Sequence, residues 1–137
     1  MPIYKAPVRD FQFLLHEYLN VGQYKDIPGF ADSGPELMTP VLEAAAQLCE
    51  EVLFPLNQKG DREGLKYENG NVHMPAGFKE AYKTYVDGGW PSFTCDPKYG
   101  GQGLPDVLNM PLMEMVCSSN LSFGLTPGLS HGAYNAI

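Results

Sequence analysis

The sequence predicts an all-α fold with about five helices, and three observations carry this prediction. Apolar residues recur at the three- and four-residue spacing of amphipathic helices along most of the chain. A hairpin signal occurs once, where an Asn-Gly pair follows a short Leu-Lys-Tyr stretch. The 15 glycines and 12 prolines show no repeat period and separate the helical stretches from one another.

The chain has the size and composition of one modest globular domain. Its 137 residues, 44% hydrophobic and 18% charged, can bury roughly two thirds of the surface that the unfolded chain exposes. We expect an N-terminal extension over residues 1–34, with one short helix and a loop. A helical domain over residues 35–137 is expected to follow, incomplete at its C-terminus.

The charge balance and the cysteines narrow the class of protein. A net charge of −7 without a Lys/Arg run argues against a nucleic-acid partner. No apolar run approaches the ~20 residues that span a bilayer, and MPIYKAPVRD lacks the apolar core of a signal peptide. We therefore expect a cytoplasmic protein with no integral membrane segment. A reducing compartment and no metal site are expected from three separated cysteines without a Cys-x-x-Cys pair, Cys49, Cys95 and Cys117.

The first helix follows Pro7, because proline suits the first turn of a helix. From there, apolar side chains keep to one helical face: Val8, Phe11, Leu14, Leu15, Tyr18 and Leu19. Glycine and proline then recur without a period up to residue 34, which predicts a loop.

The clearest helix lies in the second quarter of the chain. Ser33 with Glu36 three residues later forms a capping-box pattern, which predicts that the helix starts there. Apolar positions then keep helical spacing for about twenty residues. Pro40 leaves two alternatives open, a kink one turn into the helix or a true start at Thr39. Pro55 raises the same question near the end of the helix.

Residues 57–75 are polar and predict a surface segment that contains the hairpin turn at Asn69-Gly70. A third amphipathic helix is expected to follow, with Gly88 and Gly89 as its left-handed stop. Its apolar stripe consists of Phe78, Ala81, Tyr82, Tyr85 and Val86.

Residues 106–120 are apolar on nearly every side, which predicts a helix buried among other helices and kinked at Pro111. Because apolar positions surround Glu114 in this helix, we expect its carboxylate to form a buried structural ion pair rather than to act as a catalytic acid. Residues 121–137 carry a weaker helical pattern and end without a cap, a glycine or a basic last turn. Such an apolar end predicts a truncated chain.

The loop DPKYGGQGLP (96–105) raises the question of a phosphate site. Its glycines at positions 100, 101 and 103 do not match G-x-G-x-x-G, no Lys-Ser/Thr pair follows, and no well-formed strand precedes it. The alternative is a corner, in which Pro97 starts a turn, the glycines supply positive φ angles and Pro105 with Asp106 opens the next helix. The spacing favours the corner.

The segment GLSHG (128–132) matches the G-x-S-x-G spacing of a nucleophile elbow, with Ser130 as the nucleophile and His131 beside it. An elbow needs a strand before the serine, and the preceding SNLSFGLTP contains a proline and no strand-like run. A serine hydrolase therefore stays an alternative, but the strand that must precede its nucleophile is not predicted. His16 and His73 are isolated histidines, with no other metal-ligating residues at a suitable spacing in the sequence.

Several segments together resemble the N-terminal region of the acyl-CoA dehydrogenase family, and the resemblance covers essentially the whole chain. The opening MPIYKAPVRDFQFLLHEYLNV precedes the usual start of the family and resembles a longer bacterial branch of it. The other segments are FPLNQKGDREG (54–64), MPAGFKEAY (74–82), GGW (88–90), DPKYGGQGLP (96–105), and Glu114 with GLTPGLSHGA (124–133).

The resemblance implies an FAD-dependent enzyme that carries out α,β-dehydrogenation of an acyl-CoA thioester. It also implies an N-terminal helical domain, a middle β domain and a C-terminal four-helix domain in a homo-oligomer, with FAD bound across a subunit interface. An electron-transferring flavoprotein is the implied electron acceptor. The family's catalytic glutamate and flavin-contacting motif do not occur in residues 1–137, so this chain alone is expected to be inactive.

The first domain of the family contributes one wall of the acyl pocket. By the resemblance, this substrate-binding wall falls at Phe123, Gly124, Pro127 and His131. Positions 123, 127 and 131 share one helical face, but the same spacing suits packing against a neighbouring helix. Two alternatives to the dehydrogenase stay open, an acyl-CoA oxidase or related flavoenzyme of the same fold and a stand-alone helical interaction module.

Overall fold

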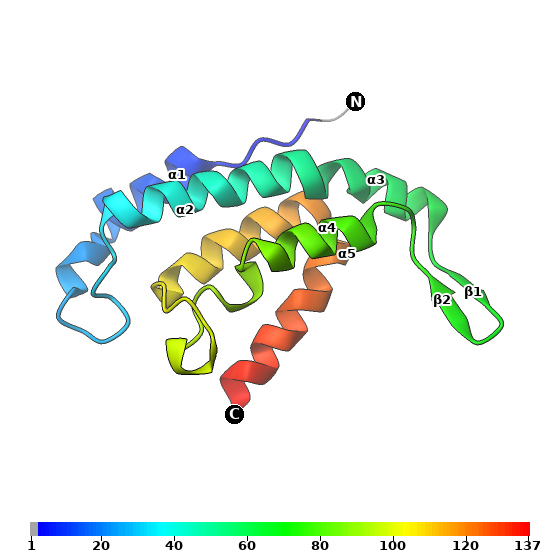
Figure 1. The fold of residues 1–137 in the computed structure, drawn as a ribbon. Coiled ribbons are helices and arrows are strands. Elements are labelled where there is room, and N and C mark those ends of the chain that lie inside the picture. Colours follow the sequence, from blue (N-terminus) through cyan, green and yellow to red (C-terminus); the bar gives the residue numbers. More distant parts are fainter. Residues whose placement is uncertain (1–2) are drawn as a thin grey trace.

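The computed structural model describes residues 3–137 and shows a helical domain with one small projecting hairpin (Figure 1). Its helices are α1 (Val8–Gln12), α2 (Pro35–Gln47), α3 (Phe54–Glu63), α4 (Phe78–Asp87) and α5 (Asn109–Ala136). The hairpin consists of the antiparallel strands β1 (Lys66–Glu68) and β2 (Asn71–His73). The predicted all-α class is confirmed. Met1 and Pro2, the first residues of the predicted extension, lie outside the described residues.

α2 and α3 belong to one continuous helical rod, because the π-helical segment Leu48–Leu53 joins them. Backbone bonds in this segment span five residues, as in the bond from the Phe54 amide to the Cys49 carbonyl. The widened turn stands directly before Pro55, which has no amide hydrogen for an α-helical bond. The rod therefore continues past Pro55, and residues 57–63 lie at the surface as predicted, although they are helical up to Glu63.

The start of α2 is set by Pro35 and not by the predicted capping box. Gly34 is the N-cap residue, and Pro35 stands in the first turn, where a missing amide hydrogen is no loss. The Ser33 hydroxyl donates to the backbone carbonyl three residues earlier (2.7 Å) instead of capping the helix. Pro40 lies inside α2, so the alternative start at Thr39 is also wrong.

α5 bends sharply at Asn120, whose backbone angles (φ −158°, ψ 86°) are not helical. Figure 1 shows its N-terminal half beneath the α2–α3 rod and its C-terminal half turning away from the rod. The predicted kink at Pro111 is wrong, because Pro111 stands in the first turn of α5, where proline is tolerated. Although α5 has 28 residues, nowhere in residues 3–137 does a helix combine the length and apolar content required to cross a bilayer.

The core lies where α4 and the first half of α5 meet the α2–α3 rod. Its most deeply buried apolar side chains are Met38, Leu42, Cys49, Leu53, Leu108, Met115 and Val116. Glu114 is exposed to solvent, so the predicted buried ion pair is wrong. Within residues 3–137 the ion pairs are Lys5–Glu50, Arg9–Glu17 and Lys83–Asp87.

The N-terminal segment lies along the rod and contributes to the same core. Phe11 and Leu15 of its helical part are buried. The Ala6 amide donates to the Glu50 carboxylate (3.0 Å), which also pairs with the Lys5 ammonium. These contacts hold the segment against the helical domain.

Candidate functional site

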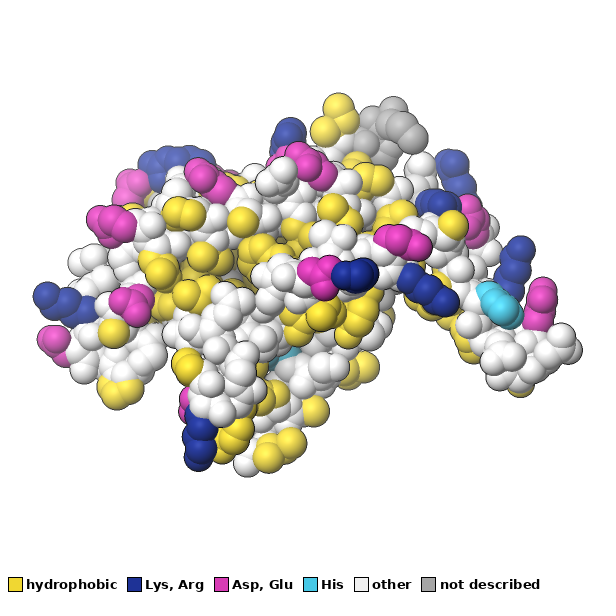
Figure 2. All heavy atoms as spheres, viewed as in Figure 1, with side chains coloured by type: hydrophobic (Ala, Val, Ile, Leu, Met, Phe, Trp, Pro, Cys, Tyr) yellow, Lys and Arg dark blue, Asp and Glu magenta, His cyan; other side chains and the backbone are white. Residues whose placement is uncertain are grey.

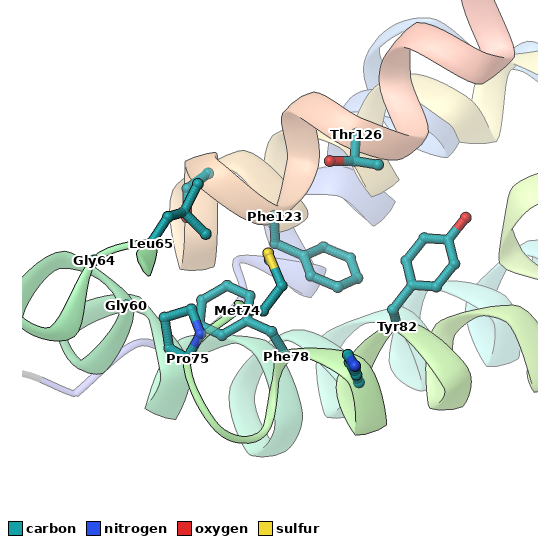
Figure 3. Close-up of a pocket in the computed structure, with 11 residues that line it drawn as sticks. Gly60, Gly64, Leu65, Met74, Pro75, Phe78, Tyr82, Phe123 and Thr126 are labelled. Carbon is teal, nitrogen blue, oxygen red and sulfur yellow. The ribbon is translucent and has the colours of Figure 1, made fainter. Parts of the chain in front are cut away.

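A cavity of about 650 Å³ lies between the end of α3, the residues on either side of the hairpin, α4 and the C-terminal half of α5 (Figure 3). Its walls are mainly apolar and aromatic, and its size is typical of a site for a small molecule. The residues that line it include Gly60, Met74, Phe78, Tyr82, Phe123 and Thr126.

Aromatic rings from α4 and α5 form the wall between the cavity and the core. The centroid of the Phe123 ring lies 5.5 Å from that of Tyr85 and 6.3 Å from that of Tyr82. Gly60 of α3 makes room for the Phe78 ring, because a Cβ at Gly60 would lie 2.6 Å from Phe78 Cζ. A side chain at position 60 would therefore displace the Phe78 ring from its place in the cavity wall.

Two titratable groups in the core behind this wall are neutral at physiological pH. Burial raises the pKa of the Tyr85 hydroxyl to about 12 and that of the Cys49 thiol to about 11. Because a thiol reacts as its thiolate, Cys49 is a structural residue and not a nucleophile. Cys95 is buried as well, and Cys117 is half-buried.

Asn120 fixes the direction of the cavity wall that α5 provides. Its buried side chain donates from Nδ2 to the Leu53 carbonyl (3.0 Å). Its Oδ1 accepts from the Ser122 hydroxyl (2.9 Å) and from the Phe123 amide (3.1 Å). The bond to the Phe123 amide is that of an N-cap, so the second half of α5 begins as a new helix at Asn120. The sequence signal of this break is the run SSN (118–120), three residues that favour caps inside an apolar segment.

The structure places the four residues predicted for the acyl pocket at different kinds of position. Phe123 lines the cavity, whereas Gly124, Pro127 and His131 are not among its lining residues. Gly124 is buried against the first half of α5, since a Cβ there would lie 3.1 Å from Val116 Cγ1. Pro127 is buried as well and lies in the second half of α5, after the bend. The cavity residues of α3 and α4 were not predicted from the sequence.

His131 carries a buried polar atom that has no hydrogen-bond partner within the described residues. This atom is Nε2, and the imidazole ring lies 6.2 Å from the Tyr134 ring, measured between centroids. The Tyr134 hydroxyl accepts from the Asp96 amide (3.0 Å), which joins the end of α5 to the glycine-rich loop.

The glycine-rich loop 96–105 forms a corner and has no amide donors left for a phosphate. Gly100 and Gly103 have the predicted positive φ angles, 85° and 67°, but Gly101 does not, so the prediction is wrong for this one glycine. The backbone amides of residues 98–104 all donate to acceptors of residues 92–97. A phosphate cradle needs such amides to be free, so the corner interpretation is confirmed.

Ser130 lies inside α5, with helical residues on both sides. A nucleophile elbow requires a strand before the serine, so the serine-hydrolase alternative is wrong. Over residues 3–137, no group of three or more His, Cys, Asp or Glu side chains could hold a metal ion.

No family model matches the chain. Curated proteins that match it are acyl-CoA dehydrogenases, and over most of its length the chain is similar to a part of these enzymes. It is 37% identical over 134 residues, 98% of its length, to the 3-methylmercaptopropionyl-CoA dehydrogenase of Ruegeria pomeroyi. It is 25% identical over 122 residues, 88% of its length, to the broad-specificity linear acyl-CoA dehydrogenase FadE5 of Mycobacterium tuberculosis.

The alignments cover most of this chain but only a small part of each relative. The shares are 23% of the Ruegeria protein and 20% of the Mycobacterium protein, so the chain spans about a fifth to a quarter of their length. The resemblance seen in the sequence segments is thereby confirmed, including the longer bacterial branch that contains 3-methylmercaptopropionyl-CoA dehydrogenase. The helical fold agrees with the N-terminal helical domain of this family.

Proposed function

We propose that the chain forms the N-terminal domain of an FAD-dependent enzyme that dehydrogenates an acyl-CoA thioester between its α and β carbons. The observation that carries this proposal is the 37% identity, over 98% of the chain, to a 3-methylmercaptopropionyl-CoA dehydrogenase. The second relative is an acyl-CoA dehydrogenase of broad specificity. Because the chain spans only part of both relatives, the activity is assigned to the whole enzyme and not to residues 3–137 alone.

Within this enzyme, we assign one wall of the acyl pocket to the C-terminal half of α5. Phe123 lines the apolar cavity, and Gly124, Pro127 and His131 follow it along the helix after the bend. An acyl chain needs a concave apolar surface of this kind with few polar groups. The buried His131 Nε2 without a partner is the polar group at the far end of this wall.

FAD is the cofactor that the family implies, and it would accept the hydride that leaves the β carbon of the substrate. The described residues do not fit a flavin site by themselves. The amides of the glycine-rich loop are all occupied, and Lys79 is the one cation among the residues that line the cavity. We therefore assign flavin binding, the catalytic base and the contact with an electron-transferring flavoprotein to other parts of a homo-oligomeric enzyme.

The longer protein that contains this chain provides the test of the activity. We expect it to purify with bound flavin and to reduce an artificial electron acceptor when butanoyl-CoA, octanoyl-CoA or 3-methylmercaptopropionyl-CoA is added. Oxygen as the only acceptor is expected to support a much lower rate. An equal rate with oxygen would assign the protein to the acyl-CoA oxidases, and a protein that oxidises none of these thioesters would overturn the proposal.

The acyl-pocket wall is tested in the same enzyme by Phe123→Ala. We expect the ratio of kcat/KM for octanoyl-CoA over butanoyl-CoA to change by about tenfold, because pocket shape discriminates methylenes by roughly 1–3 kcal/mol. Ser130→Ala, on the exposed side of the same half-helix, is the matched control. If Phe123→Ala and Pro127→Ala both leave the chain-length profile unchanged, these residues do not belong to the pocket.

A further inference from the structure

We propose that the hairpin is an interface between two copies of this chain, in which β1 pairs antiparallel with β1 of the second copy. The pairing would join the two hairpins into one four-stranded sheet around a two-fold axis at Tyr67. The proposal assigns a surface for assembly to one named element. It is independent of the dehydrogenase activity proposed above, because no part of it involves the acyl-CoA or its turnover.

The hairpin has two free edges within residues 3–137. β1 and β2 have three residues each and pair only with each other. None of the backbone–backbone hydrogen bonds outside this pair involves residues 65–73, and Figure 1 shows the hairpin projecting from the helices. A hairpin of two short strands is marginally stable by itself, and the outward amide and carbonyl groups of each strand can bond to a further strand.

One face of the hairpin is apolar and in contact with water. Side chains alternate between the two faces along a strand, and residues that pair across strands share a face. The register therefore places Tyr67 and Val72 on one face, and Leu65 and Met74 flank the strands on the same side. These four side chains are 74%, 60%, 64% and 46% exposed, in that order. In the four-stranded sheet, Tyr67 would lie beside the second copy's Tyr67, and part of this apolar surface would leave water.

The opposite face of β1 carries one positive and one negative charge, on Lys66 and Glu68. Neither residue takes part in the ion pairs found within residues 3–137, and Figure 2 shows basic, acidic and histidine side chains together on the hairpin. Antiparallel pairing around Tyr67 places Lys66 opposite the second copy's Glu68, and Glu68 opposite the second copy's Lys66. Opposite charges in directly opposed positions stabilise a sheet. β1 is therefore complementary in charge to a second copy of itself.

β2 does not have this complementarity. Its antiparallel pairing with itself around Val72 would place Asn71 opposite His73, with no pair of opposite charges at neutral pH. A lysine on an edge strand discourages pairing with unrelated strands. At the edge of β1, Lys66 meets a carboxylate only when the incoming strand carries one at the matching position. The charges thus favour a second copy of β1 over an arbitrary strand.

Sedimentation-velocity experiments on the 137-residue chain at low salt test the pairing by reversing these charges. All samples carry Leu125→Glu and Leu129→Glu, because exposed apolar residues of α5 can associate separately. Since the contact consists of short strands, we expect a weak dimer that dissociates further as salt is added. Lys66→Glu alone and Glu68→Lys alone are each expected to raise its dissociation constant about tenfold or more, because like charges then face each other at both opposed positions.

Two further samples restore the opposite charges. One is an equimolar mixture of the two single variants, and the other is the double variant Lys66→Glu with Glu68→Lys. Both are expected to return to within about threefold of the dissociation constant of unmodified β1. Lys25→Glu and Glu43→Lys make the same changes in net charge at exposed positions outside the hairpin and are the controls. Circular dichroism verifies the fold of every variant.

The proposal is overturned if the chain with unmodified β1 stays monomeric, if the single variants associate like their controls, or if neither the mixture nor the double variant regains affinity. Amide hydrogen exchange in the longer protein tests for another occupant of the edge. Protection of the β1 amides that is lost in both single variants and regained in the double variant would support the two-copy sheet. Protection that ignores these charges would assign the edge to another segment of the enzyme and overturn the proposal, while an active dehydrogenase would leave the proposed function standing.

Discussion

Asn120 shows how much of this domain depends on a single side chain. It joins the π-helical segment to the start of the second half of α5, because one amide group bonds both the Leu53 carbonyl and the Phe123 amide. Since the side chain is fully buried, water cannot replace these partners. The angle of the cavity wall is therefore set at one residue.

We predict that Asn120→Ala lowers the free energy of unfolding by about 2–4 kcal/mol. The loss combines an N-cap, worth about 1 kcal/mol, with the buried hydrogen bond to the Leu53 carbonyl and the small cavity left behind, which together cost about 1–3 kcal/mol. Urea denaturation followed by circular dichroism measures the change. Asn57→Ala, at an exposed position of α3, serves as the control and is expected to stay within about 0.5 kcal/mol of the unmodified chain. A similar small change for Asn120→Ala would contradict the structural role.

The raised pKa of the Cys49 thiol leads us to predict that the folded chain loses stability in alkaline solution. Burial raises its pKa from 9.0 to about 11, so above pH 9 the unfolded chain releases this proton while the folded chain keeps it. Unfolding is thus favoured as the pH rises from 9 to 11, by an amount on the order of 2–3 kcal/mol. Below pH 9 the thiol is protonated in both states and has no such effect.

Comparison with Cys49→Ala isolates the contribution of this thiol. The free energy of unfolding of the variant is expected to fall less between pH 8 and pH 11 than that of the unmodified chain. Cys117→Ala removes a half-buried thiol instead and is expected to keep the steeper fall. Equal pH dependence of all three proteins would show that the Cys49 thiol is not protected by the core.

At the scale of elements, the glycine-rich loop contains two neighbouring glycines that are required for different reasons. Gly100 needs its positive φ angle and has open space around its Cα. Gly101 has no positive φ angle, but a Cβ there would overlap the Cys95 carbonyl. Gly100 is required for its backbone conformation, and Gly101 is required because two backbone segments pass close to each other there.

We predict that Gly101→Ala is clearly more damaging than Gly100→Ala, although the two positions are adjacent. Alanine at 100 is strained by about 1 kcal/mol, whereas alanine at 101 forces a backbone shift that costs about 2–3 kcal/mol. Thermal denaturation compares the two variants under the same conditions. Equal melting temperatures would mean that the loop relaxes around the added methyl group.

The sequence predicts the elements whose signals are local. For α4, three of the five residues of the predicted stripe are buried, Phe78, Ala81 and Tyr85, whereas Tyr82 and Val86 are exposed. The glycine stop is found at Gly89 with a φ angle of 76°. The hairpin follows from one residue pair, because Asn69 and Gly70 both adopt the positive φ angles that such turns require. Local patterns thus locate these two elements and the face that α4 buries.

Elements that depend on tertiary contacts were not predicted. The sequence leaves the effect of Pro55 open, and the π-helical segment directly before it accompanies the continuation of the rod. The bend of α5 was expected at Pro111 and occurs at Asn120, whose partner is distant in the sequence. A proline is visible in a sequence, whereas the partner of a buried amide is not.

Some residues of the candidate site could likewise be identified from the sequence, and others could not. Phe123 was identified through the family resemblance, which compares the residues of a single segment, α5. The facing residues Gly60, Phe78 and Lys79 come from α3 and α4, and only the packing of three separate helices brings them together with Phe123. Periodicity describes one helix at a time, so it cannot show which helices share a cavity.

At the scale of the whole molecule, the second half of α5 presents an apolar row to solvent. Leu121, Leu125 and Leu129 follow one another at four-residue spacing and are 56%, 62% and 77% exposed. Figure 2 shows hydrophobic side chains along this part of the molecule, at the lower edge of the view. An exposed apolar row of this kind promotes association.

We predict that the 137-residue chain self-associates in solution through this leucine row. The double variant Leu125→Glu and Leu129→Glu is expected to shift the chain toward the monomer in sedimentation-velocity experiments. Ser118→Glu with Ser130→Glu adds the same charge at exposed positions outside the row and is expected to leave association unchanged. A chain that stays monomeric at every concentration would contradict the prediction.

The bond between Asn120 and Leu53 also constrains the order in which the domain assembles. Its partners are 67 positions apart, so closing this loop is entropically costly until other contacts have brought the segments together. We expect the rod and the first half of α5 to meet first and the bend to become fixed afterwards. The second half of α5 is then predicted to lose its hydrogen-exchange protection in mild denaturant before the core does, and equal protection of both would contradict this order.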